Sequence, residues 1–183
     1  MNIFKVFASA KGGFQEVYAS AILDWFLNPL MEHGMGNVFL LKFITEIQEK
    51  TGNKGLLDLC NKMSGYLRDD TDIKVNFENY LEKNVKTGFI NIMLKIDDWT
   101  FAIENKININ SISDNQLKRY YNGMKPKNDS TKLCLVYLIP ETDEDGLLSR
   151  RVERNFDSIK IENDNDIKVI VTWKDRSNEW PSI

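Results

Sequence analysis

The segment from Gly88 to Lys106 constrains the fold most, because apolar and polar residues alternate along much of it on both sides of Asp97-Asp98. Alternation with a period of two is typical of β-strands. If Asp97-Asp98 is a two-residue turn, the numbers of paired residues sum to 195, so that Asn91 faces Glu104. The pattern therefore predicts a β-hairpin with a defined register.

This register divides the hairpin into two faces, because successive side chains of a strand point to opposite sides. On one face Lys95 pairs with Thr100 and Met93 with Ala102, and the same face ends in Asn91, Glu104 and Lys106. The other face is wholly apolar, and we expect it to form the core. Its members are Ile90, Ile92, Leu94, Ile96, Trp99, Phe101 and Ile103.

The polar end of the hairpin suggests a chemistry. Directly opposed residues have Cβ atoms about 5 Å apart, so Asn91 and Glu104 can ligand a single ion. A glutamate and a lysine two residues apart on a strand are often simply solvated, but the apolar flanks here predict burial, and buried ionic groups have a partner or a function. Mg²⁺ takes oxygen ligands and polarises phosphates. This arrangement favours metal-assisted phosphodiester hydrolysis, with Lys106 placing the attacking water or stabilising the developing charge.

The rest of the chain alternates between helical and extended patterns, which predicts an α/β sandwich with a mixed sheet. Ser113 is predicted to open a helix, with Gln116 in the capping-box position three residues later. Helices are expected at 14–27, 38–49, 56–66, 113–121 and 147–156, and further strands at 72–77, 131–139 and 167–173.

Composition excludes several classes of protein. With 183 residues, 42% of them hydrophobic and 28% charged, the chain is expected to be one globular domain. His33 is the only histidine, which leaves little room for zinc enzymes or catalytic triads, and Cys60 and Cys134 are expected to be buried, reduced thiols. We expect a cytoplasmic protein, because the sequence shows neither a bilayer-spanning apolar run nor a secretory signal.

The net charge of −3 means that a polyanion would need a local basic patch. Two groups of basic residues are candidates, and solvated helix faces explain both equally well. One group comprises Lys118, Arg119, Lys125, Lys127 and Lys132, and the other comprises Arg150, Arg151 and Arg154.

Several motifs together resemble the PD-(D/E)XK nuclease superfamily, and in particular a bacterial branch with an "IENKI" strand and a "QLxRY" helix. The matching segments are 101–107 (FAIENKI) and 116–120 (QLKRY). Upstream, 21–29 (AILDWFLNP) followed by His33-Gly34 is similar to the branch's first helix and turn, and 138–140 and 171–173 are similar to its later strands. A Glu-x-Lys pair alone is a weak signal, but the longer combination is quite specific.

The resemblance implies a restriction-endonuclease-like αβββαβ core, with a mixed central sheet flanked by helices, that spans 1–183 as one domain. It also implies Mg²⁺-dependent (or Mn²⁺-dependent) cleavage of DNA, in defence or DNA processing, with a homodimer as a plausible assembly. Carried over by position, Glu104 is the acidic metal ligand, Lys106 the catalytic lysine and Gln116, beside them on the next helix, a further member of the catalytic set. By the same transfer, Glu16 is an extra metal contact. An equally good interpretation is that Glu16 is simply an exposed residue of a helix. Tyr120, with Lys118 and Arg119, is a candidate for contact with nucleic acid.

The sequence departs from the family pattern at one position. The family has Gly-Arg-Ile-Asp-Ile where this chain has Gly88-Phe89-Ile90-Asn91-Ile92, so that an uncharged amide replaces the usual metal-binding aspartate. Affinity for a hard divalent cation should fall as a result. Three explanations compete: Asn91 is an engineered change, a natural variant that still works through Glu104, Glu16 and a backbone carbonyl, or a mark of lost catalysis. We expect the chain to be either a small stand-alone member of the family or a shortened form of a longer protein.

Two functions therefore compete. The first is a metal-dependent DNA endonuclease, which the retention of Glu104, Lys106 and Gln116 favours. The second is a catalytically degenerate nuclease fold that serves as a nucleic-acid-binding or protein-interaction module, which Asn91 and the acidic net charge favour.

Overall fold

The computed structural model describes residues 16–65, 77–85, 88–106, 115–124, 131–140 and 147–173. Five helices and five strands lie in these ranges. The helices are α2 (Glu16–Leu27), α3 (Val38–Thr51), α4 (Lys54–Gly65), α5 (Gln116–Met124) and α6 (Leu147–Asp157). The strands are β1 (Phe77–Val85), β2 (Gly88–Ile96), β3 (Trp99–Asn105), β4 (Lys132–Pro140) and β5 (Ile167–Trp173). None of the described helices is both long and apolar enough to cross a membrane.

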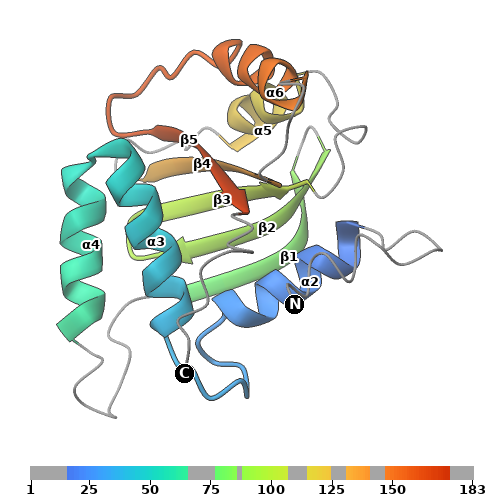
Figure 1. Cartoon of the computed structure of the whole chain (residues 1–183). Coiled ribbons are helices and arrows are strands. Elements are labelled where there is room, and N and C mark those ends of the chain that lie inside the picture. The colour runs from blue at the N-terminus through green and yellow to red at the C-terminus, as the bar shows by residue number, and fades with distance from the viewer. Residues whose placement is uncertain are drawn as a thin grey trace, which may run out of the picture.

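The strands form one sheet in the order β1-β2-β3-β4-β5 (Figure 1). β1, β2 and β3 pair antiparallel, whereas β4 and β5 run parallel to β3. α5 lies between β3 and β4 in the sequence, and α6 between β4 and β5, as crossover connections of parallel strands require. The predicted mixed α/β architecture is confirmed.

The hairpin of β2 and β3 has the register predicted from its turn. Ile96 pairs with Trp99 and Ile92 with Ile103, and both sums are 195. Asp97 occupies the left-handed region with φ of 54°, which aspartate tolerates in tight turns. Lys62 forms an ion pair with Asp97, and Lys132 contacts the carboxylate of Asp98 at 2.7 Å, so both turn carboxylates are engaged far from the other end of the hairpin.

Two predicted element boundaries differ from the structure. β1 covers Phe77–Val85, although the alternation predicted a strand at 72–77, of which residues 72–76 lie outside the described residues. The bounds of β1 are set by its pairing with β2. The sequence pattern did not show this pairing, because a short apolar run does not identify its partner strand. α5 begins at Gln116, so this residue is not the third residue of the helix as a capping box requires. Ser113 lies outside the described residues.

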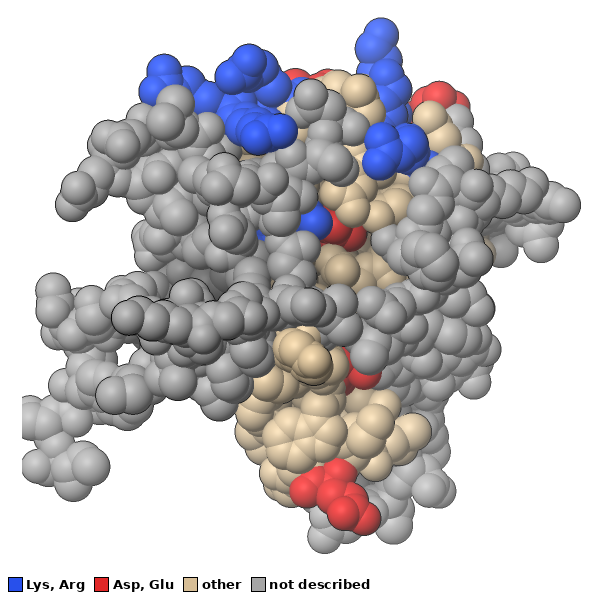
Figure 2. Space-filling view, turned by 90° about the vertical axis from the view of Figure 1, so that its right-hand side faces the viewer, with Lys and Arg blue, Asp and Glu red and all other residues tan. Residues whose placement is uncertain are grey.

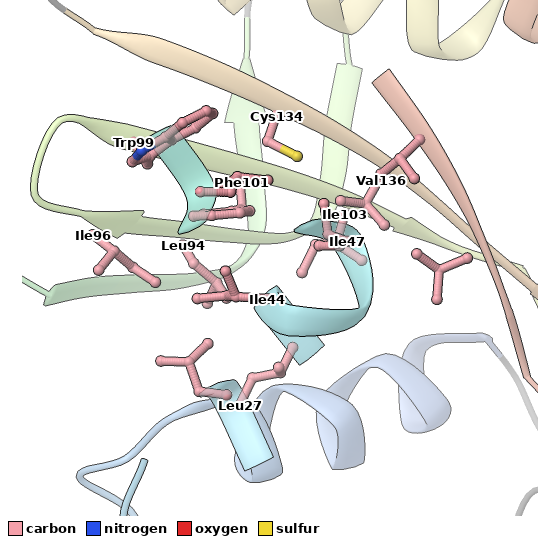
Figure 3. Packing of buried hydrophobic residues seen from close by; sticks show 14 of the residues in the cluster. Leu27, Ile44, Ile47, Leu94, Ile96, Trp99, Phe101, Ile103, Cys134 and Val136 are labelled. Carbon is pink, nitrogen blue, oxygen red and sulfur yellow. The ribbon is translucent and has the colours of Figure 1, made fainter. Parts of the chain in front are cut away.

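Helices cover both faces of the sheet. α2, α3 and α4 pack on one face, around a cluster that includes Leu94 and Phe101 (Figure 3). α5, α6 and the segment around Ile159 pack on the other face, against Met93, Ala102 and Leu135. The prediction that only one face of the hairpin is apolar core is therefore incomplete, because β3 is buried on both sides between β2 and β4.

Leucine truncation distinguishes this core from the surface. Leu94→Ala should lower the free energy of unfolding by about 2–5 kcal/mol, because the fully buried side chain leaves a cavity. Leu57→Ala on α4, where the leucine is 44% exposed, is the matched control and should change it by less than about 0.5 kcal/mol. Urea denaturation measures both, and equal effects of the two variants would contradict the assigned core.

Residues that the sequence analysis set apart from catalysis have structural roles. The backbone N–H of Met35 donates to Nδ1 of His33, whose Nε2 lies 2.9 Å from the carbonyl oxygen of Asn28, so the histidine closes the turn after α2. Cys60 and Cys134 are free and buried, and burial raises the pKa of both thiols. Neither thiol is therefore suited to act as a nucleophile.

Candidate functional site

Glu104 lies on β3 and points to the face of the sheet that α5 covers. Its neighbours Ile103 and Asn105 point to the opposite face, as alternation along a strand requires. The register of the parallel pair places Tyr137 of β4 beside Glu104. Only 1% of Glu104 is exposed, and a buried carboxylate is costly unless charged or hydrogen-bonding groups compensate it.

Lys106 supplies the compensating charge. Its Nζ lies 2.8 Å from Oε1 of Glu104, and the two side chains are only 6% and 1% exposed. The backbone N–H of Lys106 donates to the carbonyl oxygen of Leu138 at 2.8 Å, which continues the pairing with β4 beyond the end of β3. Because the pair is buried, removal of one partner would leave an uncompensated charge. The two residues therefore form one structural unit.

Gln116 completes this unit from α5. Its Nε2 donates to Oε1 of Glu104 at 2.6 Å and to the hydroxyl of Tyr120 at 2.7 Å. Gln116 and Tyr120 can meet because residues four apart lie on one face of a helix. The pKa of Tyr120 is raised, first by burial and then by the negative charge of Glu104. The structure thus brings together four of the residues that the sequence singled out.

Asn91 lies at the same end of the hairpin, but it does not pair with Glu104 as predicted. The described pairing of β2 and β3 ends at Ile92 and Ile103. Beyond it, Oδ1 of Asn91 accepts the backbone N–H of Asn105 at 3.0 Å. Strand alternation breaks here, because Ile90 was predicted to lie on the same face of the sheet as Ile92 but packs in the cluster on the α5 face. A side chain that replaces a ladder bond cannot be read from alternation alone.

Asn105 ties the site to α2 on the other face of the sheet. It is fully buried, and its Nδ2 donates to Oγ of Ser20, also buried, at 3.3 Å. The sequence did not predict a role for either residue. The position of Asn105 between Glu104 and Lys106 was the available signal, whereas nothing in the sequence marks Ser20.

The structure locates the remaining candidates only in part. Glu16 is the first residue of α2, one turn and about 6 Å along the axis before Ser20, and its side chain lies outside the description. Lys118 and Arg119 are exposed on α5, and Tyr120 is buried. The basic residues Lys125 and Lys127 lie outside the described residues, and Lys132 is at the opposite end of the hairpin, near Asp98.

The donors at this site are oxygen atoms, the type that a hard divalent cation takes. Glu104 offers a carboxylate and Asn91 an amide oxygen, and Mg²⁺ is commonly bound through one or two carboxylates together with waters and substrate phosphates. Within the described part of the chain, no group of three His, Cys, Asp or Glu side chains is placed to hold a metal. A cation held by Glu104 and Asn91 would therefore need its remaining ligands from water and substrate.

Comparison with known proteins gives one match. The model of a protein family described as the PD-(D/E)XK nuclease superfamily matches residues 1–179, nearly the whole chain. Searches of the curated proteins and of the solved structures gave no match.

Proposed function

Because the chain belongs to the PD-(D/E)XK nuclease superfamily, we propose that it hydrolyses phosphodiester bonds of DNA with the help of a divalent cation. The observation that supports this most strongly is the buried ion pair of Glu104 and Lys106, joined by Gln116 at the end of a sheet strand. Burial of such a pair costs desolvation free energy, which a purely structural role would save with apolar residues. The proposed setting is a cytoplasmic defence or DNA-processing system.

Glu104 and Asn91 are the residues that would hold Mg²⁺ or Mn²⁺, and Glu16 is proposed as an additional ligand. When bound, the cation supplies polarisation of a phosphate oxygen and lowers the pKa of a bound water. Asn91 contributes an oxygen but no charge, so we expect weaker cation binding than with an aspartate there.

The protein side chains supply positioning and charge. Lys106, fixed by Glu104, carries the positive charge that would stabilise negative charge developing on the phosphate. Gln116 holds the Glu104 carboxylate in one orientation, and the hydroxyl of Tyr120 holds Gln116 in turn. Because Oε1 of Glu104, on the central strand β3, contacts both Gln116 and Lys106, the geometry is largely formed before substrate arrives.

A second candidate function is a nuclease fold that binds nucleic acid without cleaving it. Oδ1 of Asn91 accepts a backbone N–H, which is a structural role. The described cluster also carries one negative charge, on Glu104, and one positive charge, on Lys106. A neutral cluster attracts a divalent cation less than the two carboxylates that the family pattern has.

Incubation of the chain with supercoiled plasmid and linear DNA distinguishes these functions. We expect nicked or linear products in Mg²⁺ or Mn²⁺, and intact DNA when EDTA is added. A homodimer would supply the two sites that double-strand cleavage requires, so linear product would appear alongside nicked circles. Intact substrate in every DNA and RNA sample, for both the present sequence and Asn91→Asp, would overturn the enzyme proposal and leave the binding module.

A further inference from the structure

A cavity of about 520 Å³ lies where α5 begins beside α6. The described residues that line it are Asn115, Arg151, Arg154 and Asn155, so this described part of the lining carries two guanidinium groups and two carboxamides. The chain as a whole has a net charge of −3, which makes this concentration of positive charge a local property. A lining of this kind suits an anion.

The cavity is built by bonds that fix its walls. The backbone N–H of Asn115 donates to Oδ1 of Asn155 at 2.8 Å, which ties the start of α5 to α6. Nδ2 of Asn155 donates to the carbonyl oxygen of Arg151 at 3.2 Å, so this carboxamide has a defined orientation. Asn115 itself adopts the left-handed conformation with φ of 59°. These contacts hold the two helix segments together around the cavity.

The two arginines lie on one face of α6, because residues three apart in a helix are neighbours. Both are exposed, and Nε of Arg154 donates to the carbonyl oxygen of Arg150 at 3.2 Å. That bond orients the guanidinium and uses one of its five N–H donors. Guanidinium groups match the geometry of phosphate oxygens and bind them in a bidentate manner.

The cavity adjoins the candidate site through the chain itself. Asn115 directly precedes Gln116, whose Nε2 donates to Glu104, and consecutive Cα atoms are about 3.8 Å apart. Figure 2 shows basic side chains at the top of one face, where α5 and α6 lie in Figure 1, and acidic and basic atoms that are visible below them. The cavity and the site can therefore contact one extended ligand.

We propose that this cavity binds a backbone phosphate of duplex DNA next to the phosphodiester held at Glu104 and Lys106. The inference rests on the proposed function, since it takes DNA as the ligand of that site. Phosphate contacts make up half to two-thirds of protein–DNA hydrogen bonds and set the position of the duplex on the protein. The two arginines would thus fix which phosphodiester reaches Glu104.

The test measures the affinity of a fluorescent 20-base-pair duplex in EDTA, where no cleavage occurs, for the unchanged chain and for Arg151→Gln/Arg154→Gln. We expect about tenfold weaker binding and a salt dependence, log Kd against log salt, that is shallower by about one, as loss of one phosphate contact predicts. Lys42→Gln/Lys54→Gln is the control, because it removes the same charge from exposed positions of α3 and α4. It should leave both quantities unchanged.

Each outcome separates the cavity from the catalytic proposal. Unchanged affinity in the arginine variant, or an equal loss in the control, would overturn the cavity proposal even if plasmid is cleaved. Loss confined to the arginine variant would support it even if no metal promotes cleavage. Titration with inorganic phosphate distinguishes the source of the ligand, because tight binding of free phosphate without duplex binding would overturn the assignment to DNA.

Discussion

Replacement of Lys106 by methionine is expected to lower the rate of DNA cleavage by about 10²- to 10³-fold, the usual cost of losing one group that stabilises transition-state charge. Methionine keeps most of the side-chain volume but removes the ammonium that lies 2.8 Å from Glu104. The measurement is the initial rate of plasmid nicking in Mn²⁺, together with duplex affinity in EDTA. Affinity should change far less than rate, since the lysine acts on the reacting phosphate.

Controls separate this effect from unfolding. Lys106→Met leaves Glu104 buried without its positively charged neighbour, and breaking a buried ion pair in this way lowers the free energy of unfolding by about 3–5 kcal/mol. The double variant Glu104→Gln/Lys106→Met removes both charges and should fold while remaining inactive. Lys62→Ala breaks the exposed ion pair with Asp97 at the far turn and should retain full activity. Normal cleavage by a folded Lys106→Met protein would show that the chemistry lies elsewhere.

Replacement of Asn91 by aspartate is expected to raise both the affinity for Mn²⁺ and the cleavage rate by about 10- to 100-fold. Coulomb's law gives on the order of 1–4 kcal/mol for each charge pair at 4 Å in a protein-surface environment, and about 1.4 kcal/mol corresponds to a factor of ten. The fold should be retained, because a carboxylate oxygen can still accept the backbone N–H of Asn105. Calorimetric titration with Mn²⁺ measures affinity without any need for substrate.

Asn122→Asp is the matched control for this change. It adds the same charge to an exposed position on α5, away from the cluster, and should alter neither quantity. Tighter Mn²⁺ binding without cleavage in Asn91→Asp would favour the nucleic-acid-binding module. No gain in Mn²⁺ affinity would contradict the assignment of residue 91 as a metal ligand.

The sequence predicted those parts of the fold that depend on local pattern. The two-residue turn at Asp97-Asp98 was enough to give the register of β2 and β3, because strand pairing next to a tight turn has little freedom. The strand predicted at 72–77 missed most of β1, because β1 is stabilised by pairing with β2 and sequence periodicity does not identify a pairing partner.

Only those parts of the candidate site that belong to the matching motifs were predictable from the sequence. The resemblance predicted that Gln116 lies beside Glu104, whereas the hydrogen bond from Gln116 to Tyr120 was found only in the structure. The hydrogen bond of Asn91 to Asn105 was not predictable, since it depends on a side chain that takes over a backbone hydrogen bond. The hydrogen bond between Asn115 and Asn155, which joins α5 to α6, is a tertiary contact between residues 40 positions apart, and no sequence pattern predicts it.

The alternation of three consecutive residues has a further consequence for how this chain can change. Glu104 and Lys106 serve the α5 face, while Asn105 between them bonds Ser20 of α2 on the other face. These three consecutive residues therefore connect the helices on the two faces of the sheet through its central strand. A mutation that loosens the packing of α2 can therefore shift the ion pair, because only one peptide unit separates Asn105 from each of its charged neighbours. The two faces of the sheet are thus expected to tolerate mutations together and not independently.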